Sequence, residues 1–177
     1  MKRSKSSDPF VIDENVLVVA NGRNGSQGSE TCQLACIEFL ETVKKNGALV
    51  IDSQSLTFTK YAKHALWGGD LRTGDQFFIW AFNNLILHRV VTLTGHATRD
   101  FEEFPDRPDL EKFHKNDRIW IALANATGAT VANSVDSDYK AFDAELASAG
   151  ISVKELCKSE LKNVRTRRKA QAGVDKT

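Results

Sequence analysis

Short apolar runs alternate along this chain with longer segments whose apolar residues recur at helical spacing. A short apolar run bounded by polar residues is typical of a buried strand, whereas apolar positions three and four residues apart are typical of an amphipathic helix. The short runs predict strands over residues 10–13, 48–51, 90–93, 130–132 and 151–156. The clearest helical segment covers residues 29–46, with Ser29 as a favourable N-cap and Gly47 just after its last turn.

The other helical segments are shorter or less regular. The pattern predicts helices over residues 55–66, 73–88, 109–126 and 139–149. Polar stretches rich in glycine, asparagine or proline predict loops over residues 21–28 and 94–108. The apolar run VLVVA connects the first strand to the first of these loops.

This alternation of strands and helices predicts the fold class. Strands separated by helices pair in parallel through right-handed crossovers, and the helices then cover both faces of the sheet. We therefore expect an α/β protein, a three-layer α/β/α sandwich around a central, mainly parallel sheet. The domain is expected to cover residues 10–157, between a basic N-terminal tail at 1–9 and a basic C-terminal tail at 158–177.

Composition narrows the class of protein. The chain has 177 residues, of which 41% are hydrophobic and 27% charged, as is usual for one globular domain. No apolar run is long enough to cross a membrane, and no signal peptide is evident after the basic N-terminus. The three cysteines are odd in number, so we expect no disulfide framework, and we expect Cys32 and Cys36 to pack on a helix face in a cytoplasmic protein.

The charge is distributed unevenly, although the net charge is only +1. Lysines and arginines concentrate in the two tails, around a nearly neutral body. Such basic ends can contact phosphates or an acidic partner, and they can equally be solvated tails.

Several aspartates follow predicted strands. Asp13 ends the first strand, and Asp136 and Asp138 follow the strand at 130–132. Ligands gather at the carboxyl ends of parallel strands, so these side chains are expected to lie together. Converging carboxylates repel each other unless a cation is bound, and a site with oxygen ligands alone favours Mg²⁺ or Mn²⁺.

Each aspartate also has a purely structural explanation. Asp13 suits an Asx turn, Asp136 suits a turn, and Asp138 suits the N-cap of the next helix. Asp117 suits the first turn of a helix, where the macrodipole favours an acid. The site hypothesis depends on their occurring together.

The segments VIDEN, KFHKNDRIWIALA, NSVDSDY and AGISVKELC together resemble PIN-like domain nucleases, especially bacterial ones found near defence and toxin-type loci. The resemblance covers residues 10–157. It implies a metal-dependent endonuclease that acts on RNA more readily than on DNA, with a role in toxin–antitoxin systems or antiphage defence. The implied catalytic and metal-binding residues are Asp13, Asp117, Asp136 and Asp138, which would hold Mg²⁺ or Mn²⁺. The implied partners are nucleic acid and a partner protein or a second copy of the chain, with no membrane.

Two positions depart from that pattern. The family commonly has a Glu on the second helix, where this chain has Lys60, and close relatives have an Asp where this chain has His114. Lys60 would weaken a metal site, pair with a neighbouring aspartate or contact a substrate phosphate. Glu38 or Glu41 could supply the missing carboxylate. A weakened site makes a binding module the alternative to an active nuclease, and a phosphatase is a third reading.

Four further residues are candidate contacts to nucleic acid: Asn15, Arg23, Lys60 and Arg118. For Arg118, an exposed position on a helix is the simpler expectation. The aromatic residues Trp67, Trp80 and Trp120 have apolar neighbours and are expected in the core. The scattered histidines His64, His88, His96 and His114 form no metal-binding pair at helical spacing.

Overall fold

The computed structural model describes residues 9–23, 28–46, 49–96 and 100–160, and it has a mixed α/β fold with a small parallel sheet. The parallel strands are β1 (Phe10–Ile12), β6 (Thr130–Asn133) and β7 (Val153–Glu155) in a three-stranded sheet, and β2 (Val50–Asp52) and β3 (Arg89–Val91) in a two-stranded one. β6 pairs in parallel with β1 on one side and with β7 on the other, and β2 pairs in parallel with β3. A parallel bridge between Phe10 and Leu49 connects the two groups of strands.

The predicted strands are therefore confirmed, with shifts of one or two residues at their ends. The loop predicted over 94–108 contains a short antiparallel pair, β4 (Gly95–His96) with β5 (Asp100–Phe101), so that expectation was wrong in part. The tails at 1–8 and 161–177, residues 24–27 of the loop predicted over 21–28, and Gly47 lie outside the described residues.

The helices are listed here with the bounds that the structure gives them. They are α1 (Glu14–Asn21), α2 (Glu30–Asn46), α3 (Leu56–Ala62), α4 (Thr73–Asn83), α5 (Arg118–Thr127), α6 (Ser137–Ala141) and α7 (Asp143–Ser148), with 3₁₀ turns η1 (Leu85–Leu87), η2 (Pro108–Leu110) and η3 (Lys115–Asp117). None of the helices in the described ranges combines the length and the apolar character needed to cross a membrane.

Helix α1 was not expected from the sequence. Its valine-rich segment has β-branched residues that favour strands, but Val16, Leu17 and Val19 are all buried here against other helices. The chain enters the helix at Asp13, whose side chain accepts a hydrogen bond from the Asn15 N–H at 3.0 Å. Tertiary packing and this cap outweigh the local preference.

Two other predicted helices are interrupted. The segment at 109–126 forms the turns η2 and η3 before α5 begins at Arg118, because the chain between the turns places Phe113 in the core. The segment at 139–149 is divided into α6 and α7 at Phe142, whose φ and ψ of −109° and 20° are not helical. The helix predicted over 55–66 ends early, at Ala62.

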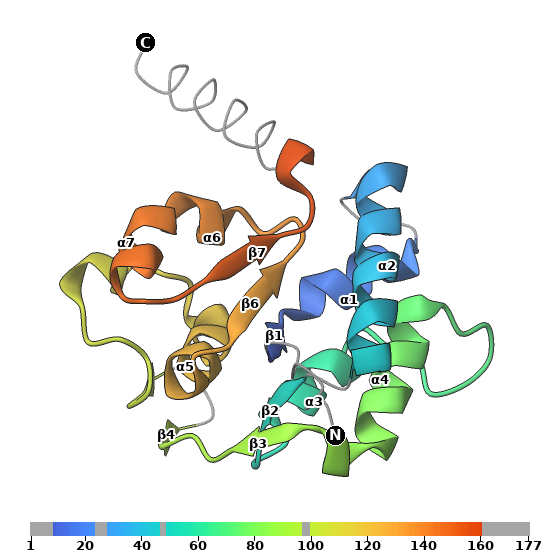
Figure 1. The fold of residues 1–177 in the computed structure, drawn as a ribbon, viewed down its shortest axis with the longest axis horizontal. Coiled ribbons are helices and arrows are strands. Elements are labelled where there is room, and N and C mark those ends of the chain that lie inside the picture. The colour runs from blue at the N-terminus through green and yellow to red at the C-terminus, as the bar shows by residue number, and fades with distance from the viewer. Residues whose placement is uncertain (1–8, 24–27, 47–48, 97–99, 161–177) are drawn as a thin grey trace, which may run out of the picture.

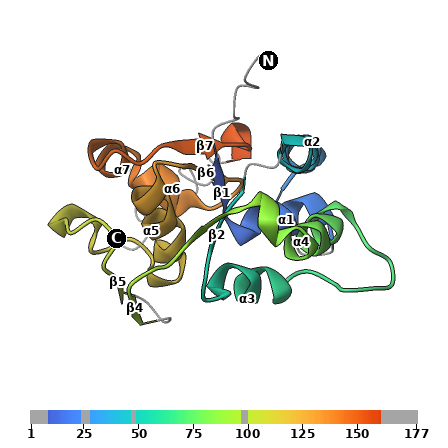
Figure 2. The same ribbon diagram turned by 60° about the horizontal axis from the view of Figure 1, so that its bottom comes forward.

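Helices lie on both sides of the central strand β1. Figures 1 and 2 show α1, α2 and α4 grouped on one side of β1 and α5 on the other. Helix α4 comes very close to α1 at Gly74, where an added Cβ would lie 2.3 Å from the Leu17 carbonyl oxygen. On the α5 side, the buried ring of Trp120 stacks on Tyr61 at a centroid distance of 5.9 Å.

Two expectations about side chains were wrong. Trp67 is 55% exposed because it lies in the connection between α3 and α4, although its ring contacts Phe78 and Phe82. Cys32 on α2 and Cys157, just after β7, form a disulfide although they are separated by 125 residues. The odd cysteine count had pointed away from this bond, and Cys36 is left as a buried free thiol.

Candidate metal site

Three aspartates from distant parts of the sequence meet at the carboxyl ends of β1 and β6. Asp13 follows β1, Asp136 follows β6, and Asp117 ends η3 just before α5. One carboxylate oxygen from each lies within 4.8 Å of the other two. β1 and β6 are parallel neighbours, so their ends lie on the same edge of the sheet. This is the placement expected from the sequence for Asp13 and Asp136.

Asp13 is the most buried member of the cluster, with 2% of its surface exposed. Its Oδ2 accepts a hydrogen bond from the Tyr139 hydroxyl at 2.7 Å, and its Oδ1 accepts one from the Asn15 N–H. Burial raises the pKa of Asp13 well above its ordinary value, and the negative charges of Glu14 and Asp117 raise it further. The charged form of Asp13 is therefore held at a cost that a cation would relieve.

Asp117 is the second member. Burial and the charge of Asp136 raise the pKa of Asp117 to about 6, although Lys60 acts in the opposite direction. Its Oδ2 lies 3.0 Å from Nδ1 of His114. His114 therefore contacts the cluster, at the position where the resemblance led us to expect another carboxylate.

Asp136, the third member, is the N-cap of α6. Its Oδ1 accepts a hydrogen bond from the Asp138 N–H at 2.8 Å. Burial raises the pKa of Asp136, and the charge of Asp138 adds to this effect. The structure does not bring Asp138 into the group of three, because its side chain belongs to the first turn of α6 beyond the cap.

Glu14 is a fourth carboxylate at this site, and the sequence reasoning missed it. Its charge raises the pKa of Asp13, Asp117 and Asp136 alike. One of its oxygens, Oε2, is buried and has no hydrogen-bond partner among the described residues. The available signal was its position directly after the strand-end aspartate in VIDEN.

Lys60 occupies the place between Glu14 and Asp117. Its Nζ lies 2.8 Å from Oε1 of Glu14 and 3.9 Å from Oδ1 of Asp117, and it lies over the Trp120 ring. Burial acts to raise the pKa of Glu14, but the charge and hydrogen bond of Lys60 outweigh it and lower that pKa. The ion pair with a neighbouring aspartate, one of the alternatives for Lys60, is present.

Neither Glu38 nor Glu41 replaces the missing family glutamate. Both lie on α2, where Glu38 is exposed and Glu41 pairs with Lys44 at 3.0 Å. Neither belongs to the group of carboxylates that the described residues bring together.

Asn15 connects the two strand ends that carry Asp13 and Asp136. Its Nδ2 donates to Oδ1 of Asn133 at 3.1 Å, and its Oδ1 accepts from the N–H and the hydroxyl of Ser134. Asn133 in turn donates to the Asp136 carbonyl at 2.9 Å. The structure therefore places Asn15 in an internal network of hydrogen bonds, which holds the end of β1 against the end of β6.

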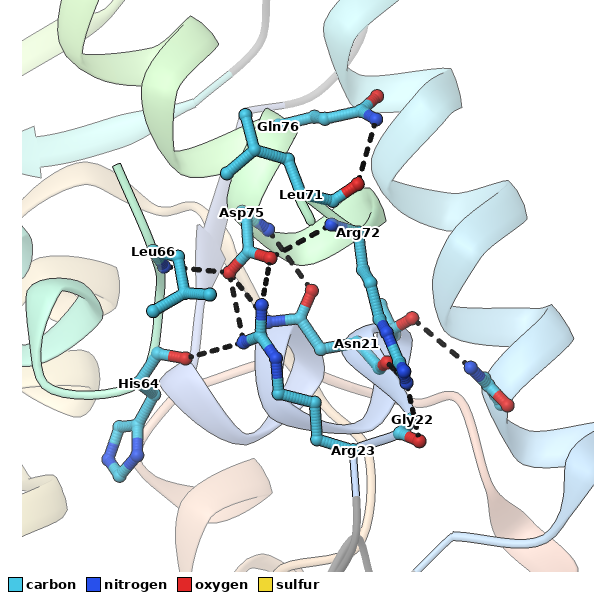
Figure 3. A network of polar contacts seen from close by, with 11 residues as sticks. Asn21, Gly22, Arg23, His64, Leu66, Leu71, Arg72, Asp75 and Gln76 are labelled. Atoms are coloured by element: carbon cyan, nitrogen blue, oxygen red, sulfur yellow. Dashed lines mark hydrogen bonds and ion pairs between the residues drawn. The ribbon is translucent and has the colours of Figure 1, made fainter. Parts of the chain in front are cut away.

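Two arginines expected as phosphate contacts are engaged elsewhere. Arg23 forms an ion pair with the buried Asp75. The Asp75 carboxylate also accepts hydrogen bonds from the Asn21 side chain and from the backbone N–H groups of Leu66 and Arg72. Figure 3 shows these donors converging on the one carboxylate. The structure places this network at the junction of α1 and α4.

Arg118 is buried rather than exposed, so that expectation was wrong. Its guanidinium pairs with Asp100 at 2.8 Å, donates to the carbonyls of Glu111 and Phe113, and lies over the Phe104 ring. These contacts attach α5 to the β4–β5 hairpin.

The arrangement has the features of a site for a hard divalent cation. Its ligand atoms are carboxylate oxygens, and burial and mutual repulsion raise the pKa of all three aspartates. No match to this chain is found among models of protein families, curated proteins or solved structures.

Proposed function

We propose that this chain is a PIN-like endonuclease that hydrolyses phosphodiester bonds with Mg²⁺ or Mn²⁺. The observation that supports the proposal best is the convergence of Asp13, Asp117 and Asp136 within 4.8 Å at the ends of parallel strands. A second observation points the same way, because the buried Oε2 of Glu14 lacks a partner beside them. A cation in the cluster would satisfy these groups together.

The fold supports the proposal. The parallel bridge between Phe10 and Leu49 places the strands in the continuous order β3-β2-β1-β6-β7. With α1, α2 and α4 on one side of β1 and α5 on the other, this order is compatible with the three-layer arrangement of PIN-like domains (Figure 2).

The residues of the site have distinct roles in this proposal. A bound divalent ion would supply Lewis acidity and a water molecule of lowered pKa. Asp13, Asp117 and Asp136 would hold it, and Tyr139 would keep the Asp13 carboxylate in one orientation. Lys60, already beside Asp117, would neutralise part of the negative charge that a phosphate brings.

The test is cleavage of single-stranded RNA and DNA by the purified chain with and without Mn²⁺. We expect metal-dependent cleavage, with RNA cut faster than DNA, and we expect Asp13→Asn to abolish it. Asp70→Asn is the matched control, since Asp70 is an exposed aspartate of the α3–α4 connection. Cleavage that persists unchanged in Asp13→Asn would sink the assignment.

The resemblance also supports a biological setting for such an activity. It implies a role beside cytoplasmic toxin–antitoxin or antiphage proteins, with RNA and either a partner protein or a second copy of the chain as partners. Retained growth of cells that express the Asp13→Asn chain, beside growth arrest with the unchanged chain, is the expected result.

The position of Lys60 favours one second candidate, a PIN-like fold that binds nucleic acid or protein without cutting. Its ammonium pairs with two carboxylates and so competes with a metal for them. Calorimetry with Mn²⁺ separates the candidates, because a binding module would take up no metal.

Lys60→Glu extends this measurement. It should raise Mn²⁺ affinity because it replaces a competing cation with a carboxylate. Lys45→Glu, on the exposed surface of α2, controls for the change in overall charge.

A further inference from the structure

Three cysteine sulfurs meet where α2 lies beside the end of β7. Cys32 and Cys36 are one turn apart on the buried face of α2, and Cys157 follows β7. Cys32 and Cys157 form the disulfide, and the Sγ atom of Cys36 lies 3.9 Å from that of Cys157. The three Sγ atoms all lie within 4.8 Å of one another, and the cluster shares no residue with the three aspartates. The proposed nuclease chemistry therefore gives these cysteines no role.

The spacing of the sulfurs is that of ligands around one metal ion. Thiolates bound at about 2.3 Å lie about 3.8–4.0 Å apart in tetrahedral or trigonal coordination. The 3.9 Å between Cys36 and Cys157 falls in this range. The Cα atoms of Cys32 and Cys157 are 5.1 Å apart. After reduction of their bond, rotation of these two side chains can therefore bring all three sulfurs to the same separation.

The surroundings of the cluster favour a closed metal site over a reactive thiol. All three cysteines are at most 3% exposed, and structural metal sites are closed to solvent in the same way. Burial raises the pKa of Cys36 to about 12, although the Ser134 hydroxyl opposes this rise. The Cys36 thiol is therefore protonated at neutral pH and is a poor nucleophile. A metal ion displaces such a proton, because it supplies the positive charge that the apolar surroundings lack.

We propose that Cys32, Cys36 and Cys157 bind one thiophilic metal ion, Zn²⁺ or Cu(I), when the chain is reduced. Soft thiolate ligands favour these two ions over the Mg²⁺ or Mn²⁺ expected at the aspartates. Cu(I) accepts three thiolates as a complete set of ligands. Zn²⁺ takes four ligands, and the Ser134 hydroxyl, which interacts with Cys36, can serve as the fourth.

The oxidation state of the chain decides whether this site exists. A dithiol reductant gives two electrons and two protons to the bond between Cys32 and Cys157, and is itself converted into a disulfide. The chain then has three thiols, and each loses its proton to solvent as its sulfur bonds to the metal. In the oxidised chain only Cys36 is left as a ligand. The disulfide and the metal are therefore alternative links between α2 and the segment after β7.

The test is metal binding by the full chain in its two oxidation states. The chain is reduced with a dithiol, separated from the reductant without oxygen, and titrated with Cu(I) and with Cd²⁺, which replaces Zn²⁺ at thiolate sites. Both ions give an ultraviolet charge-transfer band when bound to thiolates, and this band does not arise at carboxylates. We expect the band to saturate at one equivalent of at least one ion in the reduced chain. The oxidised chain should show no band.

Cys36→Ser is the decisive variant, because it removes one ligand and leaves the disulfide pair in place. Competition with a chelator measures the affinity of the reduced chain. The variant should lower it by at least about tenfold, since even changes behind the ligands of a metal site cost roughly 10–100-fold. Asp13→Asn, in the other cluster, is the control and should leave this affinity unchanged. Absence of the band with both ions, or equal affinity in the Cys36→Ser chain, would overturn the inference.

A second measurement covers the case in which the reduced chain unfolds. An ion that binds the folded cluster stabilises the folded state, so it should raise the melting temperature of the reduced chain or restore its circular dichroism signal. A band without either change would show that the cysteines bind as separate thiols of an unfolded chain, and would overturn the inference. These outcomes are independent of the nuclease proposal, which is tested by Mn²⁺-dependent cleavage.

Discussion

The Tyr139 hydroxyl donates a hydrogen bond of 2.7 Å to the buried carboxylate of Asp13. This contact joins α6 to the end of β1 across 126 residues of sequence. It also opposes the rise in the pKa of Asp13 that burial causes. Tyr139 is therefore a positioning residue for the proposed metal site, although it is not one of the carboxylates that would hold the ion.

Replacing Tyr139 by Phe should weaken metal binding. The Asp13 pKa rises further without its donor, so more of the carboxyl is protonated, and Mn²⁺ affinity should fall several-fold at pH 6. The buried oxygen also loses a partner, which should lower the free energy of unfolding by about 1–3 kcal/mol. Urea denaturation and calorimetry measure the two effects.

Tyr61→Phe is the matched control for that change. The hydroxyl of Tyr61 is equally buried and donates to the Ile12 carbonyl at 2.7 Å rather than to a carboxylate. It should cost comparable stability and leave Mn²⁺ affinity nearly unchanged. A similar loss of Mn²⁺ affinity in both variants would contradict the role given to Tyr139.

The metal-free protein should lose stability as pH rises from about 4 to about 6. Asp117 has a folded-state pKa of about 6 against an ordinary 3.8, so the folded state binds more protons than the unfolded state in this window. The loss for this residue is on the order of 2 kcal/mol. Mn²⁺ should reverse it, since a cation stabilises the charged form.

Urea denaturation at several pH values, in EDTA and in Mn²⁺, measures this dependence. Glu155, whose pKa burial raises to about 7, contributes in an overlapping window. Asp117→Asn isolates the contribution of the cluster and should flatten the curve between pH 4 and 6. An unchanged curve in that variant would show that Asp117 does not carry the effect.

Lys60→Gln should destabilise the metal-free chain and increase its dependence on metal. The variant leaves the charge of Glu14 without its counter-ion in a mostly buried position, at a cost of roughly 1–3 kcal/mol. Mn²⁺ should then raise the melting temperature more in the variant than in the unchanged chain. Thermal denaturation with and without Mn²⁺ checks this, and Lys63→Gln serves as the control, because Lys63 is exposed at the end of α3.

Reduction should lower the stability of the chain through Cys32 and Cys157. A bond that closes a loop of 125 residues is worth up to about 5 kcal/mol when the loss of unfolded-state entropy is considered alone. Thiol counting in denaturant should find one free cysteine before reduction and three after it. Cys157→Ser should abolish the effect of the reductant on unfolding, whereas Cys36→Ser should preserve it.

The sequence pattern was sufficient for the strands and for two members of the cluster. Apolar runs end at Asp13 and just before Asp136, and parallel pairing then brings those ends together. Asp117 was placed mainly by the resemblance. Asp117 reaches the other two aspartates because of the turns before α5, and no local pattern predicted those turns.

The missed features depend on contacts between distant segments. Helix α1 contains residues with strand preference and is stabilised by packing on α2 and α4. The local sequence pattern carries no information about that packing. Glu14 was overlooked because the additional carboxylate was sought on the second helix and not beside Asp13. The disulfide could not be paired from the cysteine count, because the position of Cys157 beside α2 depends on the pairing of β7 with β6, which the count does not contain.

The network around Asn15 has a consequence for how the site forms. Hydrogen bonds among Asn15, Asn133 and Ser134 fix the start of α1 against the end of β6. None of these three residues is a candidate metal ligand. Uncharged amides and a hydroxyl therefore help to hold the spacing of Asp13 and Asp136 in the folded chain. A cation would meet a preorganised pair of carboxylates, so its binding energy need not be spent on ordering the chain.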